Sequence, residues 1–265
     1  AASDVYKRQY LKRRFLLSAT DAPAIPRFVS EGDFLKLNFL EDEEQIPERI
    51  KVYTVKSPEK DKLEVLSKLL CYLGDKSSLV FVNYRESVER VYRYLLQAGI
   101  SCEMFHGGME QKDRERALYK FSNGSCNVFV STDLAARGLD IPNIDHVIHY
   151  HLPLNEDAYI HRNGRTARWD ASGNVFLILG PEEYLPEFIQ QIPEDYVWEG
   201  PKPDPAKPQW VTLYIGKGKK DKINKVDIVG FLSKVGGLGK SDIGRIDAVS
   251  YTHLRAHETD QNLVC

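Results

Sequence analysis

Residues 78–99, SLVFVNYRESVERVYRYLLQAG, join a short apolar run to an amphipathic segment, and this pair decides the fold. The run at 78–83 has the length and the β-branched content of a buried strand. The segment at 86–99 has apolar residues at helical spacing and stops at Gly99, a residue typical of helix ends. A buried strand followed by a helix is the repeating unit of a parallel α/β sheet.

The same unit recurs on both sides of this stretch. Polar clusters follow or end several of the predicted strands, at Ser18–Thr20, His106–Gly108 and Ser131–Asp133. The alternation predicts an α/β fold with a mainly parallel, doubly wound sheet, in which ligands bind beyond the carboxyl ends of the strands. We expect strands at 13–20, 34–40, 50–56, 102–106, 126–132, 144–153 and 173–180, and helices at 60–73, 111–124 and 181–192, with 156–162 continuing the alternation.

Composition limits the classes of protein that the chain can represent. The 265 residues are 42% hydrophobic and 28% charged, which is ordinary for a globular protein, and the net charge of -2 gives no overall basic field. A polyanion would therefore need a local patch. The cysteines Cys71, Cys102, Cys126 and Cys265 form no C-x-x-C pair, which argues against a zinc site or disulfide frame and favours the cytoplasm. We expect neither a membrane span nor a secretion signal.

The last quarter of the chain differs from the rest. Residues 200–208, GPKPDPAKP, contain four prolines and predict a semi-rigid, extended spacer. Beyond the spacer, we expect a strand at 209–216, a helix at 221–235 and a strand at 243–249. This pattern predicts a second, small module.

The two ends of the chain share an unusual property. DVYKRQ (4–9) and VSYTHL (249–254) can be encoded by one DNA element and its reverse complement, and this element looks like a transposon end used to tag sequencing libraries. We therefore expect residues 1–9 and 249–265 to be adaptor-derived, and the native product to continue beyond both ends.

The chemistry-bearing motif is HRNGRTAR (161–168), which places Arg162, Arg165 and Arg168 at steps of three. Taken alone, this motif also fits a solvated basic helix face with no role in chemistry. It is preceded by SAT (18–20), SLVFVN (78–83), HGGMEQKDRERAL (106–118) and STDLAARGLDIP (131–142). In this order and at these spacings, the segments resemble those of the DEAD-box RNA helicases, motors built from RecA-like domains. The resemblance covers residues 13 to 192.

The resemblance implies a site for ATP. Arg165 and Arg168 would be arginine fingers, which suit phosphate because the guanidinium stays charged and planar. His161 would relay the nucleotide state to the RNA side. Asp140 would contact the ribose hydroxyls, with Gly138 allowing close backbone approach, although Asp140 also fits a simple turn cap. The family has glycine where Ala167 stands, and we expect function to survive this change.

The resemblance also implies a site for RNA. Thr132, Asp133 and Arg137 match the segment that contacts the RNA backbone. Gln111 and Arg114 match the family's Q-x-x-R contact, although a solvated helix face fits them too. His106, Gly107 and Gly108 would let the RNA approach closely, and Ser18 and Thr20 would couple hydrolysis to strand separation.

The sequence lacks the phosphate loop G-x-x-x-x-G-K-[ST] and the tetrapeptide D-E-A-D. We therefore expect the cradle for ATP and the Mg²⁺ ligands in a first RecA-like domain that precedes this chain in cis, and we expect the chain alone to be inactive as an ATPase.

Residues 212–247 resemble the C-terminal RNA-binding domain of DbpA-type DEAD-box proteins, an RRM-like α+β fold that binds large-subunit ribosomal RNA. Residues 212–240 hold seven lysines against two aspartates. Lys217, Lys219, Lys220 and Lys222 would bind RNA phosphates, although a solubilising loop is the alternative. Tyr214 fits base stacking and ordinary packing equally well.

These inferences divide the chain. We expect adaptor-derived ends at 1–9 and 249–265, the end of a first RecA-like domain at 10–40, a linker at 41–48, a second RecA-like domain at 49–195, a proline-rich linker at 196–209 and a partial RRM-like domain at 210–248. The expected function is ATP-dependent unwinding of RNA in large ribosomal subunit assembly. A general RNA chaperone or decay helicase, a non-catalytic RNA-binding protein and a DNA translocase of the same superfamily are the alternatives.

Overall fold

The computed structural model describes residues 49–136, 144–166, 172–189, 192–218, 221–250 and 261–264. The chain forms two compact units, Ala1–Pro47 and Glu48–Cys265, and all described residues belong to the second. The predicted strands at 13–20 and 34–40 lie outside the described residues, as do Ser18 and Thr20.

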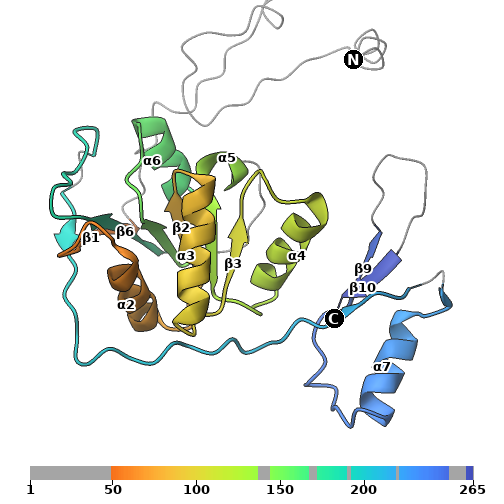
Figure 1. Cartoon of the computed structure of the whole chain (residues 1–265). Helices are drawn as coiled ribbons and strands as arrows, with labels where there is room; N and C mark the ends of the chain where they lie inside the picture. Colours follow the sequence, from red (N-terminus) through yellow and green to blue (C-terminus); the bar gives the residue numbers. More distant parts are fainter. Residues whose placement is uncertain are drawn as a thin grey trace, which may run out of the picture. The chain divides into compact units, whose positions relative to one another are not determined.

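A seven-stranded sheet forms the centre of the larger domain, and its neighbouring strands pair in parallel (Figure 1). The strand order is β3-β4-β2-β5-β6-β1-β7, so the chain crosses over between most strands. The predicted parallel α/β sheet is confirmed. The strands are β1 (Ile50–Lys56), β2 (Ser78–Val82), β3 (Cys102–Phe105), β4 (Val128–Thr132), β5 (His146–His149), β6 (Gly173–Leu179) and β7 (Glu194–Asp195).

Helices cover both faces of this sheet. Because side chains alternate along a strand, Val80 and Val82 of β2 pack with α2 and α3, whereas Phe81 faces the opposite side, toward α6. On that opposite side Phe121 of α4 packs on Phe129 of β4, with ring centroids 5.0 Å apart. The predicted doubly wound arrangement is therefore present. The helices are α2 (Leu63–Leu73), α3 (Arg85–Gln97), α4 (Gln111–Ser122), α5 (Asp133–Ala136) and α6 (Glu156–Asn163).

The helix predicted at 181–192 is wrong for the described residues 181–189, which form turns and irregular chain. The carboxylate of Glu183 accepts hydrogen bonds from the Gly180 N–H at 2.8 Å and from Lys62 Nζ at 2.7 Å, which fixes a turn where a helix would begin. Pro186 then removes a backbone donor. The chain instead adds the short edge strand β7 beside β1.

The second module contains β8 (Tyr214–Ile215), α7 (Lys225–Lys234), β9 (Asp247–Ser250) and β10 (Gln261–Val264). Its three strands are antiparallel in the order β8-β10-β9. The predicted strand–helix–strand order is confirmed, although the first strand is much shorter than 209–216. The adaptor origin of residues 249–265 and the RRM-like topology stay predictions. Over the described residues, no helix is long and apolar enough to cross a membrane.

Candidate functional site

The loops that follow β2, β3, β4 and β5 lie at one edge of the sheet because these strands are parallel neighbours. This carboxyl edge carries Asn83 after β2, His106 after β3, Asp133 after β4 and His151 after β5. Two of the predicted polar clusters, 106–108 and 131–133, are therefore on the same edge.

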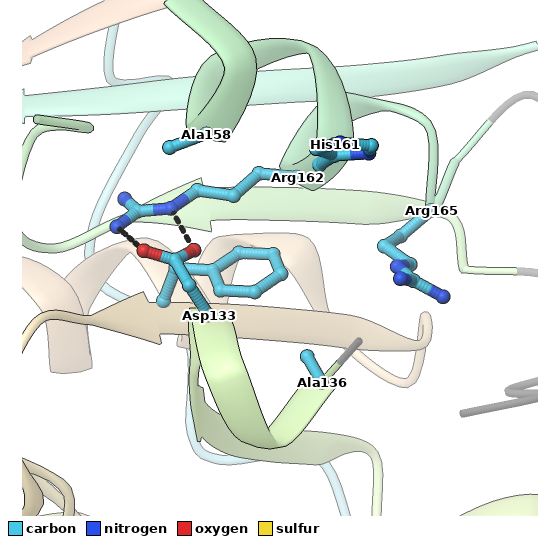
Figure 2. Close-up of a pocket in the computed structure, with 7 residues that line it drawn as sticks. Asp133, Ala136, Ala158, His161, Arg162 and Arg165 are labelled. Atoms are coloured by element: carbon cyan, nitrogen blue, oxygen red, sulfur yellow. Dashed lines mark hydrogen bonds and ion pairs between the residues drawn. The ribbon is translucent and has the colours of Figure 1, made fainter. Parts of the chain in front are cut away.

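A buried arginine holds this edge together. Arg162 of α6 is 1% exposed, and its guanidinium donates to both carboxylate oxygens of Asp133, at 2.5 and 2.6 Å. Further hydrogen bonds reach Asn83 Oδ1 at 2.8 Å and the His151 carbonyl at 2.7 Å. Figure 2 shows the two-pronged contact between Arg162 and Asp133. A buried charge is tolerated when it is paired and hydrogen-bonded in this way.

His149 completes the arrangement from β5. Its Nδ1 lies 3.3 Å from Arg162 Nη1, and its Nε2 lies 2.9 Å from Asn163 Oδ1. Because a guanidinium can only donate, Nδ1 must accept, and Nε2 therefore carries the hydrogen that it donates to Asn163. Burial, together with the positive charge of Arg162, lowers the pKa of His149 to about 3. The imidazole is therefore neutral at physiological pH.

His161 and Arg165 line a recess beside this ion pair, together with Phe81, Ala136 and Ala158 (Figure 2). Asn155 caps α6 because its Oδ1 accepts from the Ala158 N–H at 2.8 Å. The helix ends at Asn163, so Arg165 lies in the following turn, where its N–H donates to the Arg162 carbonyl at 3.1 Å. Arg165 is therefore positioned by this i-to-i−3 hydrogen-bonded turn and not by a continuation of α6.

Four predicted residues of the ATP and RNA sites, Arg137, Gly138, Asp140 and Arg168, lie outside the described residues. Their predicted roles, like those of the described site residues, stay predictions.

The segment after β3, which contains His106, Gly107 and Gly108, is organised by a buried histidine and by a neighbouring arginine. His106 is 3% exposed, and its Nδ1 accepts from the Gly108 N–H at 3.2 Å. Burial lowers the pKa of His106, although Glu89 opposes this effect. A β-carbon added at Gly108 would lie 1.9 Å from Arg85 Nη2, so the glycine makes room for a guanidinium. Arg85, at the start of α3, therefore adds an exposed positive charge to this edge.

Helix α4 carries the predicted Q-x-x-R pair. Gln111 is exposed and donates to Glu115 Oε1 at 2.8 Å. Arg114 lies with its guanidinium carbon 4.8 Å from the centre of the Phe105 ring, a cation–π distance. Thr132 is half-buried at the end of β4, and the Asp133 carboxylate is occupied by Arg162. Asp133 thus joins the start of α5 to α6 through a paired side chain.

The predicted lysines of the second module lie near the start of α7. Lys217 is exposed and pairs with Asp221 at 3.2 Å, and Lys222 is exposed with a positive φ of 63°. Lys219 and Lys220 lie outside the described residues. The Tyr214 ring is 4.4 Å from the guanidinium carbon of Arg116, so packing against α4 accounts for part of its surface.

The resemblance places the Mg²⁺ ligands in a first RecA-like domain, and the recess offers no second site for this ion. Mg²⁺ prefers carboxylate and water oxygens, but the carboxylate at the recess, Asp133, is engaged by Arg162. Within the described ranges, no group of three or more His, Cys, Asp or Glu side chains could hold a metal ion.

Sequence reasoning missed Arg162 and Arg85 as functional candidates. Arg162 belongs to the motif at 161–168, but its burial depends on the order of the strands in the sheet, which the sequence alone does not reveal. Arg85 lies two residues after the end of the predicted strand at 78–83, and this position beyond a strand end was a usable signal.

Comparisons with known proteins agree with this geometry. The helicase conserved C-terminal domain matches residues 61–170, and the DbpA RNA binding domain matches residues 212–251. The chain is 32% identical over 227 residues to the ATP-dependent RNA helicase DbpA of Bacillus subtilis, covering 74% of this chain and 47% of the relative. The corresponding values for the Escherichia coli ATP-dependent RNA helicase DbpA are 35% over 201 residues, covering 74% and 44%.

One solved structure covers the larger domain. The E. coli DEAD-box protein SrmB, bound to regulator of ribonuclease activity A, matches with a TM-score of 0.51 and 31% identity, over 61% of this chain and 98% of that chain. The present chain spans about half the length of the curated relatives that it matches. The two domain matches in this order, the parallel sheet and the motif at 161–168 show that the chain belongs to the DEAD-box ATP-dependent RNA helicases, as a DbpA-like member.

Proposed function

We propose that the intact protein is an RNA-dependent ATPase that opens short RNA duplexes, and that this chain supplies its second RecA-like domain and part of its RNA-binding tail. The observation that carries the proposal is the recess at the carboxyl edge of the sheet. There His161 and Arg165 lie beside an ion pair that joins α6 to the start of α5.

Arg165 supplies positive charge for phosphoryl transfer. In the closed enzyme, ATP is held mainly by the first RecA-like domain, and Arg165 and Arg168 approach its phosphates from this domain. An arginine delivered to the transition-state charge raises the rate by roughly 10³–10⁵. Asp140 and Gly138 hold the ribose side, and Mg²⁺ ligands come from the first domain. This chain alone is therefore expected to be inactive as an ATPase.

RNA lies across the same edge of the sheet. Four residues at this edge support the placement: Gly107 and Gly108 in the loop after β3, Thr132 at the end of β4 and Arg85 at the start of α3. They lie next to α4, which carries Gln111 and Arg114. Backbone amides, hydroxyls and arginines hold RNA phosphates without reading sequence. Ser18 and Thr20 would couple hydrolysis to strand separation from the first-domain side.

The tail selects the RNA. The match of residues 212–251 to the DbpA RNA binding domain supports this role. The lysines at 217, 219, 220 and 222 provide the local positive charge that the whole chain, with a net charge of -2, does not have. We propose large-subunit ribosomal RNA as the target and assembly of that subunit as the process. The buried free thiols Cys71, Cys102 and Cys126 suit a reducing cytoplasm.

The decisive experiment measures ATP hydrolysis by the intact protein with no nucleic acid, with large-subunit ribosomal RNA, with unrelated RNA and with DNA. Strong stimulation by the ribosomal RNA alone is expected. Equal stimulation by any RNA would indicate a general chaperone or decay helicase. Stimulation by DNA would indicate a DNA translocase, and hydrolysis under none of these conditions would indicate a non-catalytic RNA-binding protein.

A second measurement isolates the tail. Reversing the charge of Lys219 and Lys220 to glutamate should weaken binding of the ribosomal RNA and make the affinity less dependent on salt, because fewer counterions are released. RNA-independent hydrolysis should persist. An unchanged affinity for the ribosomal RNA would refute the lysine patch.

A further inference from the structure

Residues 196–212, which we call the strap, contact the larger domain at both ends of the strap and at points between them. At the start of the strap, the Tyr196 N–H donates to the Thr54 carbonyl of β1 at 2.8 Å. The Tyr196 ring packs edge-on against Tyr53 and Phe176, with centroids 6.0 and 5.5 Å apart. The strap therefore begins as an extension of the sheet edge.

Trp198 anchors the strap on α2. Its ring centroid lies 5.3 Å from that of Tyr72, and Lys68 Nζ lies 4.3 Å from the Trp198 ring centre, within cation–π range. The Tyr72 hydroxyl donates to the Gly200 carbonyl at 2.7 Å. Trp198 and Tyr196 also pack against the main hydrophobic core. An aromatic side chain with tilted and edge-on ring contacts, a cation–π contact and core contacts is a specific anchor and not a chance surface contact.

The rest of the strap touches the loops before β3 and β4. A β-carbon added at Gly99 would lie 3.8 Å from Pro205 Cγ, and one added at Gly124 would lie 3.7 Å from Trp210 Cδ1. At the end of the strap, Thr212 Oγ1 accepts from Asn123 Nδ2 at 2.8 Å and lies 2.7 Å from Ser125 Oγ. The strap is therefore held at both ends and between them.

These contacts place the strap at the amino edge of the sheet, opposite the candidate site. Gly99 precedes β3, Gly124 and Ser125 precede β4, and Tyr72 lies at the end of α2 just before β2. The prolines at 201, 203, 205 and 208 restrict the unbound chain, so less conformational entropy is lost when the strap docks. A flexible tether would need none of the aromatic contacts.

We propose that the strap is a docked arm, and that it fixes the point at which the RNA-binding tail leaves the helicase domain. The tail then starts beside residues 123–125, at the edge opposite the recess. RNA bound to the tail must extend around the helicase domain to reach the carboxyl edge. The docked arm therefore restricts unwinding to duplexes that lie far enough from the tail-binding site to reach that edge. The docking rests on the contacts above, whereas its effect on duplex choice rests on the proposed function.

The docking is tested on the 265-residue chain by ¹⁵N relaxation. Backbone order parameters of about 0.85 are expected over 196–212, whereas a free tether gives values below about 0.6. Trp198→Ala should lower the values around the mutated anchor, and Tyr72→Phe, which removes only the bond to Gly200, should have a smaller effect. Val197→Ala is the matched control, because Val197 is 74% exposed. Low values in the unaltered chain, or no change in Trp198→Ala, would overturn the proposal.

Spin-label distances test the consequence for the tail. Spin labels are attached at Glu86→Cys on α3 and Val226→Cys on α7, in a chain that also carries Cys265→Ser. The remaining cysteines, Cys71, Cys102 and Cys126, are buried and should not react with the label. Burial also raises the pKa of Cys102 to about 12, which keeps this thiol protonated. A narrow distance distribution is expected, and Trp198→Ala should broaden it. A broad distribution in the parent chain would refute the fixed exit point. Neither measurement involves ATP or RNA, so a failure of the proposed function would leave both outcomes intact.

Discussion

Arg162 and Asp133, 29 residues apart in sequence, form a two-pronged ion pair that joins α6 to the start of α5. Arg162 lies three residues before Arg165, which lines the recess. Asp133 directly follows Thr132, which lies at the edge proposed for RNA. The pair therefore links the two elements to which the proposed function assigns contacts with nucleotide and with RNA.

Removing one member of this pair should destabilise the fold. Asp133→Ala leaves the Arg162 charge buried, with the guanidinium 1% exposed, and unpaired buried charges cost about 3–5 kcal/mol. Urea unfolding of the chain, followed by circular dichroism at pH 7, measures this loss. Asp75→Asn, an exposed turn residue, is the control and should change the free energy of unfolding by less than about 0.5 kcal/mol. Equal stabilities of the two variants would show that the ion pair is not a structural link.

His149 should make the fold sensitive to acid. Its pKa of about 3 in the folded chain lies below the usual 6.5, so between these values only the unfolded chain binds the proton. Its contribution to stability is therefore complete above pH 6.5 and falls as the pH drops toward 3. The expected loss from this imidazole between pH 6.5 and 5 is about 1.5 kcal/mol.

Nuclear magnetic resonance checks this prediction directly. The ring nitrogens of His149 should show the Nε2–H tautomer and no titration between pH 7.5 and 4.5. Titration of His149 near pH 6.5 would contradict the buried arrangement with Arg162.

The parallel sheet could be predicted because each strand carries its own signal. The run at 78–83 has an apolar centre, LVFV (79–82), and strand β2 is buried along its whole length. The helix at 181–192 was predicted from local composition, and it failed because Glu183 is held by Lys62, which lies 121 residues away. Contacts of this kind depend on the tertiary structure and leave no local pattern.

The same limit applies to the candidate site. The motif at 161–168 identified the segment, and the family resemblance assigned roles to Arg165 and Arg168 but none to Arg162. Only the fold separates Arg162, buried between Asn83 and Asp133, from Arg165 at the recess. The packing of the proline-rich linker through Trp198 was likewise invisible, because its partners lie on α2.

Arg165→Ala in the intact protein should lower kcat for ATP hydrolysis by roughly 10³–10⁵, because the transition-state charge loses its guanidinium. Binding of RNA by the tail should be unchanged, since the tail lies in a separate module. Arg93→Ala on α3, where the Arg93 Nε donates to the Glu89 carbonyl, is a control that should keep normal turnover. Unaltered kcat in Arg165→Ala would remove Arg165 from the catalytic machinery.

Gly108→Ala and Gly107→Ala form a matched pair that tests the role of Arg85. The new methyl group at 108 would lie 1.9 Å from Arg85 Nη2, whereas the one at 107 would meet nothing within 4 Å. Because a guanidinium at the end of a flexible side chain can move, both variants should fold with less than about 1 kcal/mol of lost stability. Only Gly108→Ala should displace Arg85.

The displacement should appear as weaker RNA binding by the intact protein. Gly108→Ala and Arg85→Ala should raise the Kd for single-stranded RNA by similar factors, and the double variant should be no weaker than Arg85→Ala alone, because both changes remove the same contact. Gly107→Ala leaves Arg85 in place, so any loss of affinity in this variant measures only the close approach of RNA at this loop. If the two single effects add in the double variant, Gly108 contacts RNA through its own backbone and not by seating Arg85.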